Sequence, residues 1–138
     1  MADNCIFCKI VAGEIPSLKI HEDETCIATL DIGPASKGHT LIIPKKHYDD
    51  VNDGTDPALL GKLMFTAAEI GKRQKKLLHA DGFNIVQNNG EAAGQTVHHL
   101  HIHVIPRYEG GPLIAGWTPG DPGKEELQEV YELLKEVQ

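Results

Sequence analysis

Apolar residues along this chain recur in two patterns that together predict both strands and helices. Four short segments are rich in β-branched residues and are bounded by proline, glycine or polar turn residues; they are 25–32, 38–44, 83–87 and 97–106. The last of them alternates histidine with leucine, isoleucine and valine. Strands in hairpin-like succession around one long helix favour an α+β fold with an antiparallel sheet.

The helical pattern is clearest in residues 57–78, where apolar residues recur at the spacing of one helix face. Asp56 precedes this segment and can cap its first turn. A terminal amphipathic helix is predicted for residues 124–137, and a short helical turn for residues 5–12. Between residues 110 and 123, glycine and proline recur without a clear period.

The histidine strand carries the most informative pattern in the chain. Successive side chains of a strand point to opposite faces, so His99, His101 and His103 are expected to share one face. The residues expected on the other face, toward a core, are Leu100, Ile102 and Val104. His98 falls on the face opposite the three histidines and is expected to be structural or exposed.

A row of imidazoles is difficult to explain as packing, because histidine is costly to bury and changes charge near neutral pH. From spacing alone the row can be a metal site, a nucleophile site or a structural cluster. Residues 88–97, which lead into it, are rich in glycine and amide side chains. Such a loop is either a simple hairpin connection or an anion site, in which backbone N–H groups beside a nucleophilic histidine suit phosphoryl transfer.

The cysteine pair Cys5 and Cys8 has three possible interpretations. A redox pair is expected between a strand and a helix, whereas this pair precedes any clear strand. Two thiolates at this spacing can also form half of a zinc site, which then needs two further ligands. The third interpretation is two incidental apolar cysteines, the role that we expect for Cys26 in its strand.

Composition narrows the class of protein. A chain of 138 residues with 41% hydrophobic and 24% charged residues is typical of one globular domain. A formal net charge of -7 disfavours a general nucleic-acid binder. No apolar run approaches the ~18–20 residues that span a bilayer, and the N-terminus has no apparent signal peptide. We therefore expect a cytoplasmic protein that binds neither membranes nor nucleic acids.

At this point the sequence resembles the histidine-triad (HIT) superfamily, whose signature alternates three histidines with apolar residues as residues 99–105 do. The other matching segments are 5–10, 13–16, 30–32, 38–39, 43–47 and 94–97. The resemblance to the bacterial Hint-like branch covers residues 5–107 of one predicted domain, 1–138, with a C-terminal extension at 108–138. It implies a HIT-like fold, with an antiparallel sheet of about five strands, one long helix and a C-terminal helix.

The resemblance also implies an activity. In this family the middle histidine attacks the α-phosphorus of a nucleotidyl conjugate, and water then releases the nucleoside monophosphate from a covalent nucleotidyl-histidine. Carried over, His101 is the nucleophile, and His103 and His39 support it. The implied substrates are purine nucleoside phosphoramidates or related conjugates of AMP or GMP. A diadenosine polyphosphate hydrolase and a non-enzymatic AMP-binding adaptor are the alternatives.

Further roles follow from the same resemblance. Asp31 matches the position that binds the ribose hydroxyls. The other implied nucleotide contacts are Asn88, Gly94, Gln95, Thr96 and Val97 around the phosphate, and Ile6, Phe7, Ile10 and Ile32 around the base. A structural zinc ion is implied on Cys5, Cys8, His47 and His99, with no organic cofactor. A homodimer is also implied, in which Trp117 resembles the tryptophan that reaches a neighbouring active site.

Overall fold

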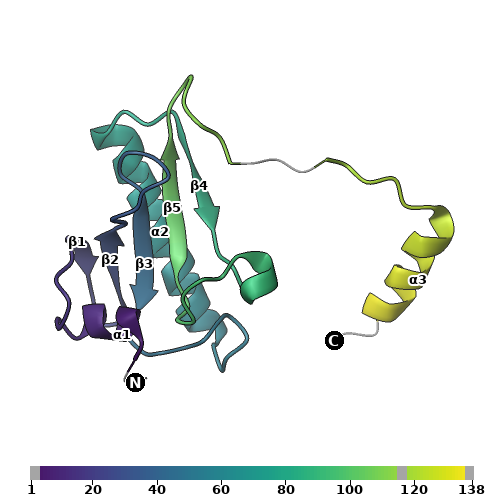
Figure 1. Cartoon of the computed structure of the whole chain (residues 1–138), viewed down its shortest axis with the longest axis horizontal. Coiled ribbons are helices and arrows are strands. Elements are labelled where there is room, and N and C mark those ends of the chain that lie inside the picture. Colours follow the sequence, from purple (N-terminus) through teal and green to yellow (C-terminus); the bar gives the residue numbers. More distant parts are fainter. Residues whose placement is uncertain (1–3, 115–117, 136–138) are drawn as a thin grey trace.

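A five-stranded antiparallel sheet forms the centre of the computed structural model, which describes residues 4–114 and 118–135 (Figure 1). The strands are β1 (Lys19–Glu22), β2 (Cys26–Leu30), β3 (Thr40–Pro44), β4 (Gly82–Val86) and β5 (Ile102–Arg107). Their order across the sheet is β1-β2-β3-β5-β4. The helices are α1 (Ile6–Val11), α2 (Pro57–Leu77) and α3 (Lys124–Leu134), with a 3₁₀ turn at Glu91–Ala93. The predicted α+β architecture is confirmed.

The long helix α2 packs on one face of the sheet and forms the main core. Asp56 caps it as predicted, because its carboxylate accepts a hydrogen bond from Leu59 N at 2.8 Å. The buried residues of α2 in this core are Leu63, Ala67 and Ile70. They meet buried sheet-side residues Cys26, Ala28, Ile42, Leu100, Ile102 and Val104. The apolar residues that alternate with the histidines therefore face α2, as their spacing predicts.

The opposite face of the sheet carries a second apolar cluster beneath α1. The alternate residues of β2 and β3, Ile27, Leu41 and Ile43, are buried there. They pack against Cys5, Phe7 and Cys8, which belong to α1 and its N-cap position. The short N-terminal helix is thus fixed by apolar contacts on the same side of the sheet as the histidines.

Two local differences from the sequence prediction have simple physical causes. Strand β5 begins at Ile102, later than the predicted residue 97, because Leu100 N donates a 2.6 Å hydrogen bond to the Tyr48 carbonyl outside the sheet. The apolar pattern of the sequence does not predict strand β1. It is an edge strand with mostly exposed side chains, so it lacks the apolar alternation that marks a half-buried strand.

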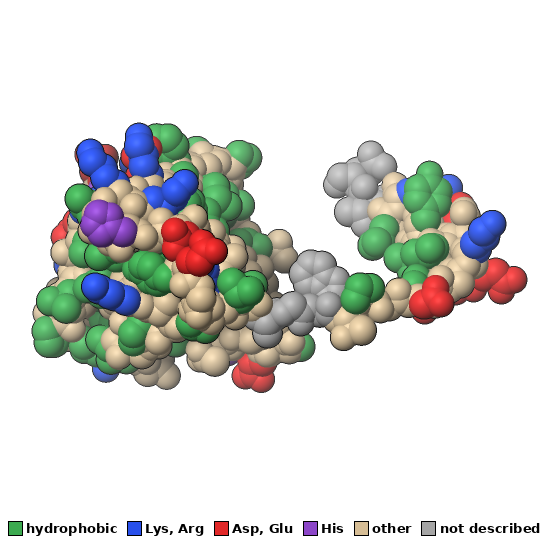
Figure 2. Space-filling view, turned by 90° about the horizontal axis from the view of Figure 1, so that it is seen from above, with side chains coloured by type: hydrophobic (Ala, Val, Ile, Leu, Met, Phe, Trp, Pro, Cys, Tyr) green, Lys and Arg blue, Asp and Glu red, His purple; other side chains and the backbone are tan. Residues whose placement is uncertain are grey.

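Helix α3 stands apart from the sheet, and all of its residues are exposed (Figures 1 and 2). Hydrophobic side chains gather on one side of it. Trp117 lies outside the described residues, so its predicted position is not addressed. No helix of the described ranges is both long and apolar enough to cross a membrane.

The packing of α2 predicts unequal costs for two identical substitutions. Leu63 is fully buried in the core, whereas Leu77 at the end of the same helix is 64% exposed. We expect Leu63→Ala to lower the free energy of unfolding by about 2–5 kcal/mol, because it leaves a cavity. Leu77→Ala is the control and should cost less than about 0.5 kcal/mol. Urea denaturation followed by circular dichroism measures both, and equal losses would contradict the assigned core.

Candidate active site and metal cluster

The rings of the three signature histidines are linked by contacts between His101 and His103 and by Phe7, which contacts both His99 and His101. The ring centroids of His101 and His103 are 5.0 Å apart. The ring of Phe7 meets His101 edge-on at 4.9 Å and His99 at 6.0 Å. Helix α1 therefore lies directly against the row, and the structure brings the N-terminal segment and the signature histidines into one site.

His101 is held with one ring nitrogen available for chemistry. Its Nδ1 donates a 2.7 Å hydrogen bond to the His99 carbonyl, which assigns the ring proton to Nδ1 and leaves the lone pair on Nε2. The residue as a whole is 7% exposed. Burial lowers the pKa of His101 below its ordinary value of 6.5, opposed in part by this hydrogen bond and by Asp31. The imidazole is therefore neutral near pH 7, which is the nucleophilic form.

His39 and His103 form a hydrogen-bonded pair with fixed tautomers. Ala35 N donates to His39 Nδ1 at 3.0 Å, so the ring proton of His39 lies on Nε2. His39 Nε2 then donates to His103 Nδ1 at 2.9 Å. A neutral His103 must consequently carry its proton on Nε2. A backbone N–H thus sets the donor nitrogen of His103 through two rings.

Burial keeps this pair uncharged. It lowers the pKa of His103 to about 4, assisted by the neighbouring His101 and His39 rings. Burial also lowers the pKa of His39, and the carboxylate of Asp31, 3.6 Å from His39 Nε2, opposes that shift. Near pH 7 the pair is therefore neutral and offers one oriented N–H donor.

The residues predicted to contact ribose and base differ widely in exposure. Asp31 is half-buried, and one of its oxygens accepts a 2.8 Å hydrogen bond from Gly33 N. Phe7 is buried against the histidine row, whereas Ile6 is 48% and Ile32 is 99% exposed. Ile10 is half-buried beside the cluster under α1. The apolar residues predicted to contact the base thus range from buried to almost fully exposed.

The loop before the histidines has the backbone expected of an anion site. Gly94 has φ +96°, and a Cβ atom there would lie 3.8 Å from Asn88 Nδ2, so these two residues are adjacent. Within the described residues, the N–H groups of Thr96 and Val97 donate to no protein acceptor. A cavity of about 420 Å³ that is lined by both residues and by Ile6 also borders Cys5 and His47, and its lining does not include His101 or His103. Unpaired N–H groups beside a cavity can bind phosphate oxygens.

The side chain of Gln95 is hydrogen-bonded within the loop that leads to the histidines. Its side chain is buried at 3% exposure, and its Oε1 accepts from Gly90 N at 2.8 Å. Its Nε2 donates to the carbonyls of Asp49 at 2.7 Å and Val97 at 3.1 Å. Because both ends of the amide are hydrogen-bonded within the protein, the side chain holds the loop in shape.

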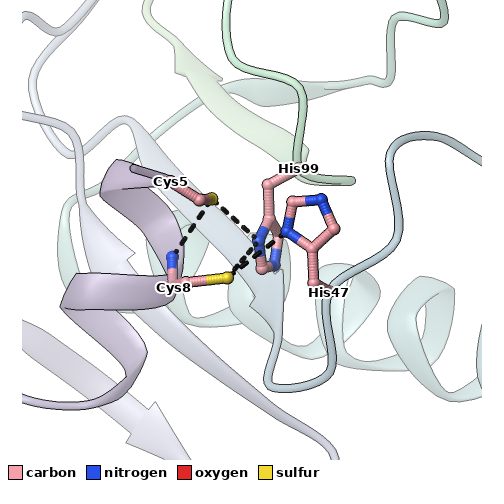
Figure 3. Close-up of side chains that lie close together, drawn as sticks. All are labelled: Cys5, Cys8, His47 and His99. Carbon is pink, nitrogen blue, oxygen red and sulfur yellow. Dashed lines mark hydrogen bonds between the residues drawn. The ribbon is translucent and has the colours of Figure 1, made fainter. Parts of the chain in front are cut away.

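Four residues that are far apart in the sequence meet beside the histidine row (Figure 3). They are Cys5, Cys8, His47 and His99, with their ligand atoms within 4.8 Å of one another. Cys5 Sγ lies 3.4 Å and Cys8 Sγ 3.5 Å from His99 Nδ1, and Cys8 Sγ lies 3.3 Å from His47 Nδ1. Zinc–sulfur and zinc–nitrogen bonds of ~2.3 and ~2.0 Å in a tetrahedron separate such atoms by roughly 3.3–3.8 Å.

The protonation of this cluster also suits a metal ion. His99 Nε2 donates to the Pro44 carbonyl at 2.9 Å, and His47 Nε2 donates to the carboxylate of Asp49 at 2.8 Å. Each ring therefore directs an unprotonated Nδ1 toward the two sulfurs, and burial lowers the pKa of His99. Neutral imidazoles oriented by a second hydrogen bond are the usual zinc ligands. The residues present fit zinc.

Two contributors to the site are absent from the sequence prediction. Asp49 orients His47, and Ala35 fixes the tautomer of His39. Asp49 had a weak signal, since it is a carboxylate two positions after a candidate ligand. Ala35 acts through its backbone, so its residue type carries no signal at all.

Known proteins with similar sequences cover nearly the whole chain. "Protein hit" of Bacillus subtilis is 48% identical over 94% of this chain and 90% of its own length. The adenosine 5'-monophosphoramidase HNT1 of Saccharomyces cerevisiae is 41% identical over 97% of this chain and 83% of its own length.

Solved structures and a family model agree with these relatives. SMU.412c of Streptococcus mutans has a TM-score of 0.91 at 40% identity, over 100% of this chain and 88% of its own. A Zn-bound histidine triad family protein of Mycobacterium smegmatis has a TM-score of 0.76 at 40% identity, over 98% of both chains. The model of the HIT domain matches residues 12–110. The site is thus built on a HIT domain, and the chain belongs to the HIT family.

Proposed function

We propose that this protein cleaves purine nucleoside phosphoramidates, or related AMP and GMP conjugates, at the α-phosphorus. The observation that carries the proposal is the tautomer of His101. Its Nδ1 proton is held by the His99 carbonyl, so a neutral ring presents the Nε2 lone pair as the nucleophile. Family membership supports a nucleotide hydrolase, and the relative HNT1 is named for phosphoramidase activity.

The proposed reaction has two steps at phosphorus. The Nε2 lone pair of His101 forms a bond to the α-phosphorus while the bond from phosphorus to the amine breaks, and the amine takes up a proton from solvent. Water then attacks the nucleotidyl-histidine and gives up a proton to solvent, as the bond from phosphorus to Nε2 breaks; this releases the nucleoside monophosphate and restores the neutral ring. Both steps develop negative charge on the phosphate oxygens, which the His103 Nε2–H and the N–H groups of Thr96 and Val97 are suited to stabilise.

Other residues divide the recognition of the nucleoside. The carboxylate of Asp31 can accept hydrogen bonds from two ribose hydroxyls. Phe7 and the more exposed Ile6, Ile10 and Ile32 provide apolar contacts for a purine. Asn88 lies next to Gly94 and adds an amide to the phosphate loop. These roles explain why the loop is held in shape by Gln95 before any ligand binds.

The proposal predicts a covalent intermediate on His101. Rapid quenching without acid during turnover of an adenosine phosphoramidate should give a transient nucleotidyl adduct at this residue by intact-protein mass spectrometry. His101→Ala should reduce kcat by more than about 10³-fold while AMP binding is largely retained, because only the nucleophile is removed.

His98→Ala is the matched control, since His98 is an exposed neighbour whose nearest charged partner is Glu91 at 3.7 Å. It should turn over like the wild type. Normal turnover by His101→Ala would contradict the mechanism. AMP binding by a wild type that hydrolyses none of the conjugates would instead favour the adaptor, and selective hydrolysis of diadenosine polyphosphates would favour the second enzyme class.

We further propose that Cys5, Cys8, His47 and His99 hold one structural zinc ion. The support is their mutual spacing and the orientation of both rings by Pro44 and Asp49. Four protein ligands leave no open position for water, so the ion would contribute stability and not act on substrate. It would join α1 to the segment that leads into β5.

Metal analysis tests this assignment. Purified protein should contain one zinc ion per chain, and Cys8→Ala should abolish it and lower the Tm by roughly 10 °C or more. Cys26→Ala is the control, because Cys26 is equally buried but belongs to the core beneath α2. If removal of zinc from the wild type left its Tm unchanged, the structural role would be disproved.

We also propose a homodimer in which a second copy covers the apolar side of α3. This side consists of Leu127, Val130, Tyr131 and Leu134, which are 44–64% exposed. An isolated helix of 11 residues is marginal in water, so α3 needs a packing partner. A groove of about 400 Å³ along α2 is lined by three lysines, complementary to the glutamates of α3. The alignment with SMU.412c covers the whole chain, α3 included.

Light scattering after size exclusion tests the dimer. The wild type should have twice the 15.1 kDa mass of one chain, and Leu127→Asp combined with Tyr131→Asp should shift it to 15.1 kDa. Gln128→Asp adds the same kind of charge to α3 outside the apolar side and should leave the dimer intact. A monomeric wild type would refute the proposal, as would a dimer that the double variant does not dissociate.

A further inference from the structure

A buried glutamine on α2 contacts the backbone beside both members of the His39–His103 pair. Gln74 is 4% exposed and lies in the helix that covers the opposite face of the sheet. Its Nε2 donates to the Gly38 carbonyl at 3.1 Å and to the Val104 carbonyl at 3.0 Å. Gly38 directly precedes His39, and Val104 directly follows His103.

The bridge lies where the backbone ladder between the two segments ends. The register of β3 and β5 runs from Ile42 opposite Ile102 to Thr40 opposite Val104, and Gly38 lies beyond it. His39 is therefore outside the paired part of β3. The amide of Gln74 joins the two backbones at this point and serves as one additional rung.

Gly38 is also pressed against the end of α2. It has φ +95°, and a Cβ atom there would lie 2.3 Å from Leu78 Cδ1. The same short stretch of helix thus contacts Gly38 twice, through the amide of Gln74 and through the side chain of Leu78. These contacts with α2 and its C-cap residue therefore fix the position of the segment that carries His39.

The oxygen of the same side-chain amide is in an unfavourable environment. Gln74 Oε1 is buried without a hydrogen-bond partner among the described residues. A buried orphan carbonyl is unfavourable for folding, and this cost offsets part of the gain from the two hydrogen bonds that Nε2 donates. The Gly38 carbonyl also accepts a hydrogen bond from Thr40 Oγ1 at 2.9 Å, so the glutamine is not required to satisfy it.

We propose that Gln74 is a positioning residue that sets the spacing between the backbones carrying His39 and His103. It keeps the two rings in hydrogen-bond contact and so maintains the Nε2–H of His103 as the oriented donor. The catalytic consequence rests on the proposed function of this pair, whereas the positional claim concerns the unliganded protein.

The test uses Gln74→Met, which keeps the length of the side chain but donates no hydrogen bond. In ¹⁵N NMR spectra of the zinc-loaded, folded variant, we expect His103 to lose its fixed tautomer as its ring separates from His39 Nε2, while His39 keeps the tautomer that Ala35 N sets. With adenosine phosphoramidate, kcat should fall tenfold to about 100-fold with little change in KM, because the donor is misplaced and the ground-state contacts remain.

Thr66→Val is the matched control. Thr66 is also a buried polar residue of α2, but its hydroxyl donates to the Lys62 carbonyl in its own helix. The ring signals of His103 and the kcat should therefore remain as in the wild type. Wild-type ring signals in Gln74→Met would overturn the proposal whatever the activity, so its failure is distinct from failure of the phosphoramidase assignment. Gln74→Leu is the second variant, and unfolding of both would also overturn it by showing a purely structural role.

Discussion

The hydrogen bond from His101 Nδ1 to the His99 carbonyl is the contact on which the rest of the site depends. It fixes the tautomer of the His101 ring. The acceptor residue, His99, has its own ring oriented by the Pro44 carbonyl and facing two cysteines. The backbone of a proposed metal ligand thus orients the proposed nucleophile two residues away. Stability and chemistry meet in one short segment, which explains why the N-terminal helix is packed against it.

The site also separates charge from reactivity. Burial lowers the pKa values of His39, His99, His101 and His103, so the row is a set of neutral dipoles near pH 7. Each ring then has a direction that is set by its donor and acceptor partners. Asp31 is the carboxylate closest to the His39–His103 pair, and it opposes the shifts without forming a short contact. The arrangement suits a phosphate, since it offers donors without a competing cationic ring.

The alternation of residue types predicted the facing of β5, whereas the meeting of the cysteine and histidine ligands was implied by the family resemblance. Alternation placed Leu100, Ile102 and Val104 toward a core, where the structure finds them. The pattern did not reveal that the side chain of Gln95 holds the loop, because a hydrogen-bonding residue in a loop has no marked direction. It had no means of finding Ala35, which acts through a main-chain N–H. Gln74 did carry a signal, as a polar residue in the apolar pattern of α2.

The exposure of Ile32 has a consequence for how relatives can diverge. A side chain that is 99% exposed contributes little to the folded core, so its replacement leaves stability nearly unchanged. The histidines, in contrast, are largely buried and hydrogen-bonded to the backbone, so their replacement also affects the fold. Under the base contact proposed for Ile32, selection can therefore alter the preference for one base over another in single steps, while the histidines stay fixed. In this architecture, an exposed position such as Ile32 can change without loss of stability, whereas the buried histidines cannot.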